Sequence, residues 1–302
     1  ATLYARDAAG PAVALRTALL ASALPFFFLV GWLMTPDAPL AAAWAAALYY
    51  LQRALIDGRS RAWIGAGVAI GVGMLSKYSM ILVPAAAFAF VLLDARSRRV
   101  LVSPWAWTGV VVALAVFAPV IVWNVQHDWA SFTFQGARRL ATSDRRFEFP
   151  QFLLYILIIV TPWAVAGLTS SLARSRREMR APARSATPDP ARDTARRRWW
   201  FVVVFTFVPL AGFAVPSLWS ETKLHWTGPI WLAALPAIAS SFGPASGDAG
   251  PVARLLARTW VPLLHSLMLG YALALFYYPV WGLAGIRALP SFAQTPWREL
   301  RS

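Results

Sequence analysis

The sequence contains no cysteine, which excludes disulfides, thiolate metal sites and thiol redox chemistry. Acidic residues and histidines are also scarce, with 13 and 3 respectively against 28 lysines and arginines. The glycine-rich phosphate loop, the dinucleotide-binding fingerprint and the nucleophile elbow are all missing from the sequence. The sequence therefore does not predict a nucleotide-binding enzyme or a serine hydrolase of these types.

Lysine is almost absent, because only Lys77 and Lys223 are lysines among the 28 basic residues. Lys77 is the one charged residue between Ala62 and Leu93, where an ammonium is costly unless it faces water or an anion. A lysine is a compact point charge that suits a phosphate. We interpret both lysines as candidate anion contacts in a membrane-embedded cavity. Alternatively, Lys77 lies at the tip of a helical hairpin and extends its charged end to the membrane interface.

Apolar residues are present in excess. Hydrophobic residues make up 59% of the 302 positions, 16 residues are tryptophan, and the mean hydropathy is +0.55. This composition predicts an all-α, polytopic membrane protein. A net charge of +15 would suggest nucleic acid in a soluble protein, but the arginines stand at the ends of apolar runs. We therefore expect membrane lipids, and no nucleic acid, as partners.

The apolar runs predict about nine transmembrane or short membrane helices in a single membrane domain over residues 1–302. A kink is expected at Pro25, and a disordered basic loop is expected at residues 174–198. The third and fourth runs are too short to span a bilayer alone, so we expect other helices to surround them. The nine predicted segments are residues 11–34, 36–56, 63–76, 79–93, 104–123, 150–172, 199–216, 226–242 and 259–283.

The charge distribution predicts the orientation of these segments. If the 53–61 loop is cytoplasmic, the cytoplasmic loops hold seventeen basic residues and the opposite side holds nine. The polar groups on that opposite side then share one face of the membrane, and we expect a site there. They occur in residues 35–37, 76–78, 124–149, 220–225 and the tail from about residue 285.

Asp37 has two interpretations. An acidic residue in the first turn of a helix is stabilised by the helix dipole and by free backbone N–H groups. Alternatively, its carboxylate pairs with Lys77 or holds a sugar hydroxyl, since a carboxylate and a lysine in one cavity stabilise each other.

The other candidates lie in two loops. His127 and Asp128 are adjacent, which is a weak signal for a divalent metal because neighbouring side chains point in different directions. Arg138 and Arg139 either clamp a phosphate or lie at the membrane interface. Between Trp219 and Trp226, three ionisable side chains occupy every second position, so they share one side if the segment is extended. The segment is either part of a site or a polar turn within an aromatic belt. These three side chains belong to Glu221, Lys223 and His225.

Four strings in this order are similar to one family: residues 35–40 (TPDAPL), 71–78 (GVGMLSKY), 123–132 (WNVQHDWASF) and 223–229 (KLHWTGP). The chain resembles bacterial membrane glycosyltransferases of the protein O-mannosyltransferase and aminoarabinose transferase superfamily, which is glycosyltransferase family 39-like and has the GT-C fold. The resemblance covers nearly the whole chain.

The resemblance implies that a sugar on a polyprenyl phosphate is transferred, with inversion, to a glycan, lipid or protein acceptor on the periplasmic face of the bacterial inner membrane. It implies that a carboxylate serves as general base and that basic residues neutralise the departing phosphate. Asp37 matches the family's second acidic position, Lys77 its cavity lysine and Lys223 a lysine of a late loop. One of Arg138 and Arg139 matches a phosphate contact. Tyr78, His127, Glu221 and His225 complete the expected substrate-binding set.

The family's catalytic acidic residue precedes a helix pair that would lie upstream of Ala1. We therefore expect this chain to be part of a longer protein, and we assign no catalytic base to it. A transporter or flippase of a lipid-linked anion is the alternative function, because it would need the same basic cavity. Such transporters usually contain paired repeats, and none is evident in the sequence.

Overall fold

The computed structural model describes residues 2–32, 35–134, 147–180, 189–220, 222–243 and 250–286. Throughout these ranges the regular structure is helical, which confirms the all-α class. The chain divides into two compact units, Ala1–Arg258 and Thr259–Ser302. The second unit is described only within its helical part, and the single membrane domain expected over residues 1–302 stays a prediction.

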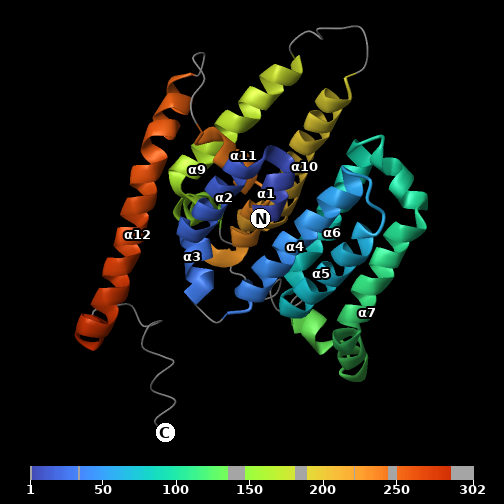
Figure 1. Ribbon diagram of the computed structural model, residues 1–302. Coiled ribbons are helices and arrows are strands. Elements are labelled where there is room, and N and C mark those ends of the chain that lie inside the picture. The colour runs from blue at the N-terminus through green and yellow to red at the C-terminus, as the bar shows by residue number, and fades with distance from the viewer. Residues whose placement is uncertain are drawn as a thin grey trace. The chain divides into compact units, whose positions relative to one another are not determined.

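The first part of the chain forms a run of helices linked by short turns (Figure 1). They are α1 (Thr2–Ala9), α2 (Pro11–Ala23), α3 (Pro25–Trp32), α4 (Asp37–Leu55), α5 (Ala62–Ser76), the 3-10 helix η1 (Tyr78–Ile81), α6 (Leu82–Leu93), the 3-10 helix η2 (Ser97–Val102) and α7 (Pro104–Gln126).

The later part contains longer helices and a compact irregular region. Its elements are α9 (Phe149–Arg180), α10 (Pro190–Ala214), the 3-10 helices η3 (Pro216–Leu218) and η4 (Leu224–Leu232), α11 (Leu235–Ser241) and α12 (Pro251–Ile286).

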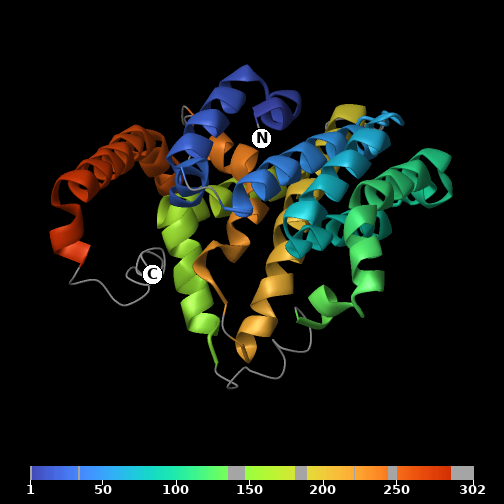
Figure 2. The same cartoon turned by 90° about the horizontal axis from the view of Figure 1, so that it is seen from below.

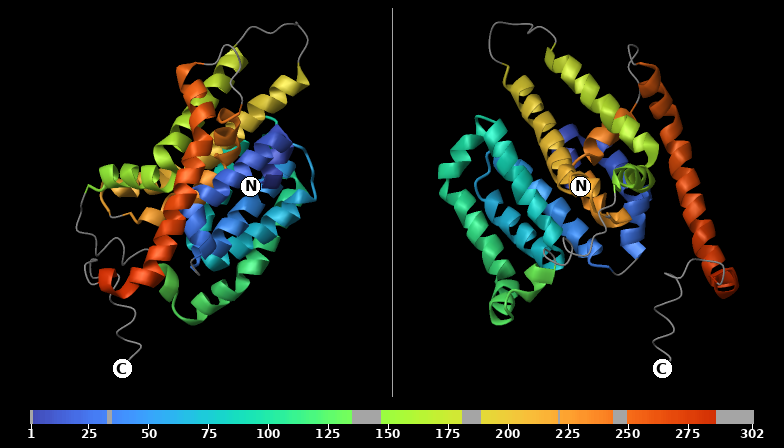
Figure 3. Two further views of the ribbon diagram at one scale, coloured as in Figure 1. Left: turned by 60° about the vertical axis from the view of Figure 1, so that its left-hand side comes forward. Right: turned by 180° about the vertical axis from the view of Figure 1, so that it is seen from behind.

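Prolines mark the helix starts and bends. Helices α2, α7 and α10 have proline in their first turn, where the missing N–H costs nothing. The bend predicted at Pro25 is confirmed, because α2 and α3 meet there at 66°. Within α9, Thr161 has a non-helical backbone, with φ 70°, and precedes Pro162, which disfavours the helical region in the residue before it. The two halves of α9 consequently run in different directions (Figure 3).

Within the described ranges, three segments are long and apolar enough to cross a membrane: α7, α9, and α10 with η3. The bent α2–α3 pair is a fourth if its two helices form one span. Only 11% of the most apolar window of α7 is buried by the rest of the protein. A helix surface that is both apolar and uncovered is typical of contact with lipid. Shorter apolar helices, α5 and α6, lie among these segments, as expected for a polytopic membrane bundle.

Two expectations about the later part of the chain, at residues 174–198 and 226–242, are wrong. The described parts of residues 174–198 are helical, because residues 174–180 continue α9 and residues 190–198 begin α10. Asp189 caps α10 by accepting a hydrogen bond from the N–H of Ala191 at 2.9 Å, and Pro190 occupies the first turn. This Asp-Pro pair is a helix-start signal that the abundance of arginine obscured.

The second error concerns residues 226–242, which do not form one membrane helix. They form η4 and the short α11, with Pro229 inside η4 and Pro236 in the first turn of α11. Proline removes a backbone donor and disfavours the helical region in the residue before it, so two prolines seven residues apart weaken a continuous α-helix here.

Helices α4, α5 and α7 lie side by side (Figure 2), and α5 packs between the other two through glycines. A Cβ added to Gly67 would lie 2.2 Å from the carbonyl oxygen of Gly109, and one added to Gly109 would lie 2.6 Å from the carbonyl oxygen of Trp63. Small residues that let two backbones approach in this way are typical of membrane helix interfaces.

We expect Gly67→Ala to destabilise the protein by about 1–3 kcal/mol, because the new methyl group would collide with the backbone of α7. The matched control is Gly31→Ala in α3, where no atom lies within 4 Å of the added Cβ. This control should be neutral or stabilising by up to about 1 kcal/mol. Unfolding by denaturant in detergent measures both, and equal stability of the two variants would contradict the close packing.

The arginine-rich ends of the helices converge on one buried ion pair. Arg197 of α10, which is 8% exposed, donates from Nε to Asp94 Oδ2 at 3.0 Å. The guanidinium also donates to the carbonyl oxygens of Leu55 and Ile56 at the end of α4, and to Ser97 Oγ. Arg197 thus provides donors for carbonyl groups that a helix end leaves without partners.

Arg197→Met should destabilise the protein by about 3–5 kcal/mol, because Asp94 would remain buried without its cation. The neighbouring Arg196 is the control, since its side chain is 56% exposed and its ion pair with Asp193 lies at the surface. Arg196→Met should cost about 1 kcal/mol or less. Thermal unfolding in the same detergent measures the stability of both variants. Equal stability of Arg197→Met and Arg196→Met would contradict a structural role of Arg197.

Candidate substrate site

Asp37 and Lys77 form an ion pair where two helices meet. Asp37 stands in the first turn of α4, and Lys77 follows α5 in an extended conformation, with φ −162°. Lys77 Nζ lies 2.8 Å from Asp37 Oδ1. The Asp37 side chain is 9% exposed and the Lys77 side chain 28%, so the lysine keeps access to the outside while the carboxylate is nearly enclosed. Figure 1 shows the start of α4 and the end of α5 at the lower end of the helices.

His225, at the start of η4, completes this group. Its Nε2 lies 3.7 Å from Asp37 Oδ2. Burial lowers the pKa of His225 below 6.5, the positive charges of Lys77 and Lys223 lower it further, and the carboxylate of Asp37 opposes them. His225 is therefore neutral at pH 7. We call Asp37, Lys77, Lys223 and His225 the Asp37 cluster; it carries one negative charge and two positive charges.

Tyr78 follows Lys77 directly and connects the site to the end of α7. Its hydroxyl lies 2.8 Å from Ser131 Oγ, and Ser131 Oγ donates to Asn124 Oδ1 at 2.7 Å. Because Ser131 uses its proton on Asn124, the hydroxyl of Tyr78 is the donor in the first bond. The ring of Tyr78 stacks on Phe132, with ring centroids 5.2 Å apart.

Asn124 and Ser131 were not predicted as site residues. Asn124 is fully buried and its amide is fixed on both sides, because Nδ2 donates to the carbonyl oxygen of Val120 at 2.9 Å. Both residues belong to the 123–132 string on which the family resemblance rests. The signal available in the sequence was an asparagine at the end of an otherwise apolar run.

The other predicted residues are placed differently. His127 stacks on Trp123, with ring centroids 4.2 Å apart, and its Nδ1 lies 2.8 Å from the carbonyl oxygen of Trp123. These contacts are within its own helix end, so a role of His127 in substrate binding stays a prediction. Arg138, Arg139 and Glu221 lie outside the described residues. Within the described ranges, no group of three or more metal-ligating side chains occurs.

The signs of the charges around His225 can be tested by titration. Lys77→Met should raise the pKa of His225, because a nearby positive charge is removed, whereas Asp37→Asn should lower it, because a nearby negative charge is removed. The protein has three histidines, so NMR of the imidazole carbons with His225→Gln for assignment can follow each one. Ser76→Ala is the control, because the Ser76 hydroxyl bonds to Val72 of its own helix. Shifts of the same sign in both charge variants would contradict the cluster.

The family model of dolichyl-phosphate-mannose-protein mannosyltransferases matches residues 2–123. This region contains Asp37, Lys77 and Tyr78, while Lys223 and His225 lie beyond it. A search of curated protein sequences finds no match.

The fold is similar to that of ArnT from Cupriavidus metallidurans, solved as a crystal structure in the apo state, with a TM-score of 0.58 and 20% sequence identity. The match covers 92% of this chain and 47% of ArnT, so this chain spans about half the length of that protein. Together with the family match, this likeness confirms the resemblance to the GT-C superfamily that the sequence strings indicated.

Proposed function

Because the chain has the GT-C fold of membrane glycosyltransferases, we propose that it forms the donor-binding part of an enzyme that uses a polyprenyl-phosphate sugar. The sugar is transferred with inversion to a glycan, lipid or protein acceptor on the periplasmic side of a bacterial inner membrane. The Asp37 cluster is the observation that carries this proposal.

The charges of the Asp37 cluster suit a leaving group that becomes a phosphate. Breaking the bond between sugar and lipid phosphate leaves negative charge on the phosphate oxygen, and positioned cations stabilise it. Lys77 carries three N–H donors and, among the described residues, uses one of them on Asp37, which leaves two that can bind phosphate oxygens. Lys223 supplies a second cation near His225.

Asp37 acts as a positioning residue in this proposal. Its carboxylate holds the ammonium of Lys77 at 2.8 Å and faces His225 on its other oxygen. An isolated lysine at this depth would be costly, whereas the ion pair keeps it charged and in place. We assign no general base for the acceptor hydroxyl to the described residues.

The orientation is supported by the grouping of the arginine-rich loops. Arg96 pairs with Asp193, and Arg197 reaches the end of α4, so the loops at residues 56–61 and 94–103 meet the start of α10. The Asp37 cluster lies at the other end of α4. The positive-inside rule makes the arginine-rich end cytoplasmic, and the cluster then faces the periplasm.

We expect Lys77→Ala to reduce donor kcat/KM by about 10- to 100-fold, which corresponds to losing a charged hydrogen bond of about 1.5–3 kcal/mol. Lys77→Arg should retain much more activity, because it keeps the positive charge. The assay uses the complete product of the gene in detergent, with a radiolabelled polyprenyl-phosphate sugar. Ser76→Ala, next to Lys77 but bonded within α5, is the control and should retain wild-type activity.

Wild-type activity in Lys77→Ala would refute the phosphate role, and unfolding curves in the same detergent show whether the variant is folded. The same assay tests the alternative of a transporter or flippase. Transfer of label to an acceptor in detergent, where no membrane separates two compartments, requires an enzyme. Binding of the donor without any transfer would favour the transporter.

A further inference from the structure

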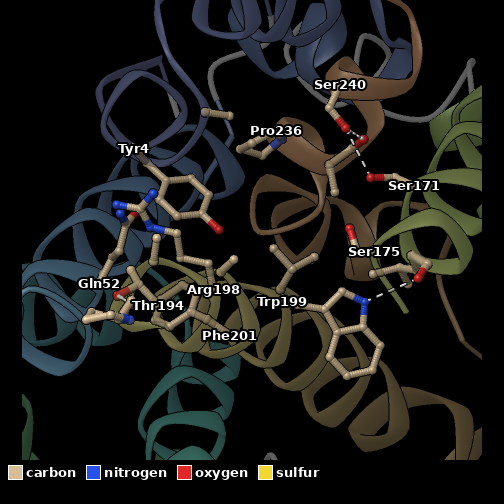
Figure 4. Close-up of a pocket in the computed structure, with 17 residues that line it drawn as sticks. Tyr4, Gln52, Ser171, Ser175, Thr194, Arg198, Trp199, Phe201, Pro236 and Ser240 are labelled. Carbon is tan, nitrogen blue, oxygen red and sulfur yellow. Dashed lines mark hydrogen bonds between the residues drawn. The ribbon is translucent and has the colours of Figure 1, made fainter. Parts of the chain in front are cut away.

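A second polar region lies at the arginine-rich end of the helices. It is a cavity of about 560 Å³ between α1, α4, α9, α10 and α11 (Figure 4), and none of its lining residues belongs to the Asp37 cluster. The polar side chains that line it are those of Tyr4, Gln52, Ser171, Ser175, Thr194, Arg198 and Ser240. The volume is within the usual range for small-molecule sites.

Gln52 indicates that this cavity binds a ligand. The residue lines the cavity and is 2% exposed, yet neither its amide nitrogen nor its amide oxygen has a hydrogen-bond partner among the described residues. Burying such a group without a partner costs about 1–3 kcal/mol. A ligand that carries both an acceptor and a donor would satisfy both atoms of this amide.

The charge of the cavity favours an anion. Arg198 lines it, and Arg174 donates to Ser240 Oγ at its rim, at 3.2 Å. Among the described lining residues none is acidic. Burial raises the pKa of Tyr4, so its hydroxyl is neutral beside Arg198. Figure 4 shows Tyr4, Gln52 and Arg198 close together on one side of the cavity.

The remaining lining is apolar. It includes the side chains of Leu172, Trp199, Phe201, Val202 and Pro236. A small, free anion would gain nothing from contact with this apolar surface, whereas acyl chains would be buried against it. Basic pockets between membrane helices on the cytoplasmic side are known to bind anionic lipid headgroups.

We propose that this cavity binds the phosphate ester of an anionic phospholipid from the cytoplasmic leaflet. Arg198 contacts the phosphate, and the acyl chains lie against Trp199 and Phe201. The amide nitrogen of Gln52 donates to an ester oxygen, and its amide oxygen accepts from a hydroxyl of the headgroup. The site is distinct from the donor site and is independent of the proposed reaction.

The test measures thermal unfolding of the purified protein in detergent with added phosphatidylglycerol or with phosphatidylcholine of the same acyl chains. Phosphatidylglycerol should raise the midpoint by about 3–5 °C, because a ligand that binds only the folded protein stabilises it. Phosphatidylcholine should raise it by much less. Glycerol phosphate without acyl chains should have no effect, whereas an equal effect would indicate a free-phosphate site and overturn the lipid assignment.

Arg198→Met and Gln52→Leu should each raise, by about tenfold, the concentration of phosphatidylglycerol that gives half of the maximal stabilisation. Arg177→Met is the matched control: it removes one arginine from the same end of the molecule, at an exposed position of α9 outside the cavity. An equal loss in Arg177→Met would show a non-specific charge effect and overturn the proposal.

Ser175→Phe provides a second, independent variant, because it places a large side chain in the cavity and leaves Arg198 and Gln52 unchanged. It should abolish the lipid response, and a normal response would overturn the proposal even if the other two variants fail to fold. Lys77→Ala should respond to phosphatidylglycerol like the wild type. A failure of the donor-site proposal is therefore distinguishable from a failure of this one.

Discussion

The ion pair between Lys77 and Asp37 is the interaction on which the proposed donor site depends. An ammonium in an apolar helix bundle is tolerated only with an anion or water beside it, and Asp37 meets that need at 2.8 Å. The pair also fixes the geometry, because Asp37 begins α4 and Lys77 ends α5. Tyr78 then extends the site towards α7 through Ser131, so that three helix ends form one polar region.

At the opposite end of the bundle, a buried cation is again paired with a carboxylate. Arg197 is buried there against Asp94 and satisfies carbonyl groups at the end of α4. Its role is structural, because its guanidinium joins the end of α4 to Asp94 and Ser97. Arg198, the next residue, lines the cavity that Gln52 also lines. Two successive arginines thus have different roles, one in stability and one in the proposed lipid site.

The helix packing fixes the positions of the groups at these two ends. Glycines at positions 67 and 109 let α5 and α7 approach to backbone contact, and α5 also packs against α4. Larger side chains there would separate the helices and, with them, the groups at their ends. The stability of the bundle and the geometry of the site therefore depend on the same contacts.

The sequence by itself determined the all-α membrane class, the kink at Pro25 and the isolation of Lys77, because hydropathy, proline chemistry and charge are local properties. It also predicted the region of the candidate site, through strings that resemble a known superfamily. The tertiary structure alone decided that His225 faces Asp37 and that Asn124 anchors Ser131. It also decided that Gln52 lies beside Arg198 without a hydrogen-bond partner among the described residues. These are contacts between residues far apart in the chain, and their existence depends on how the helices pack, which no local pattern specifies.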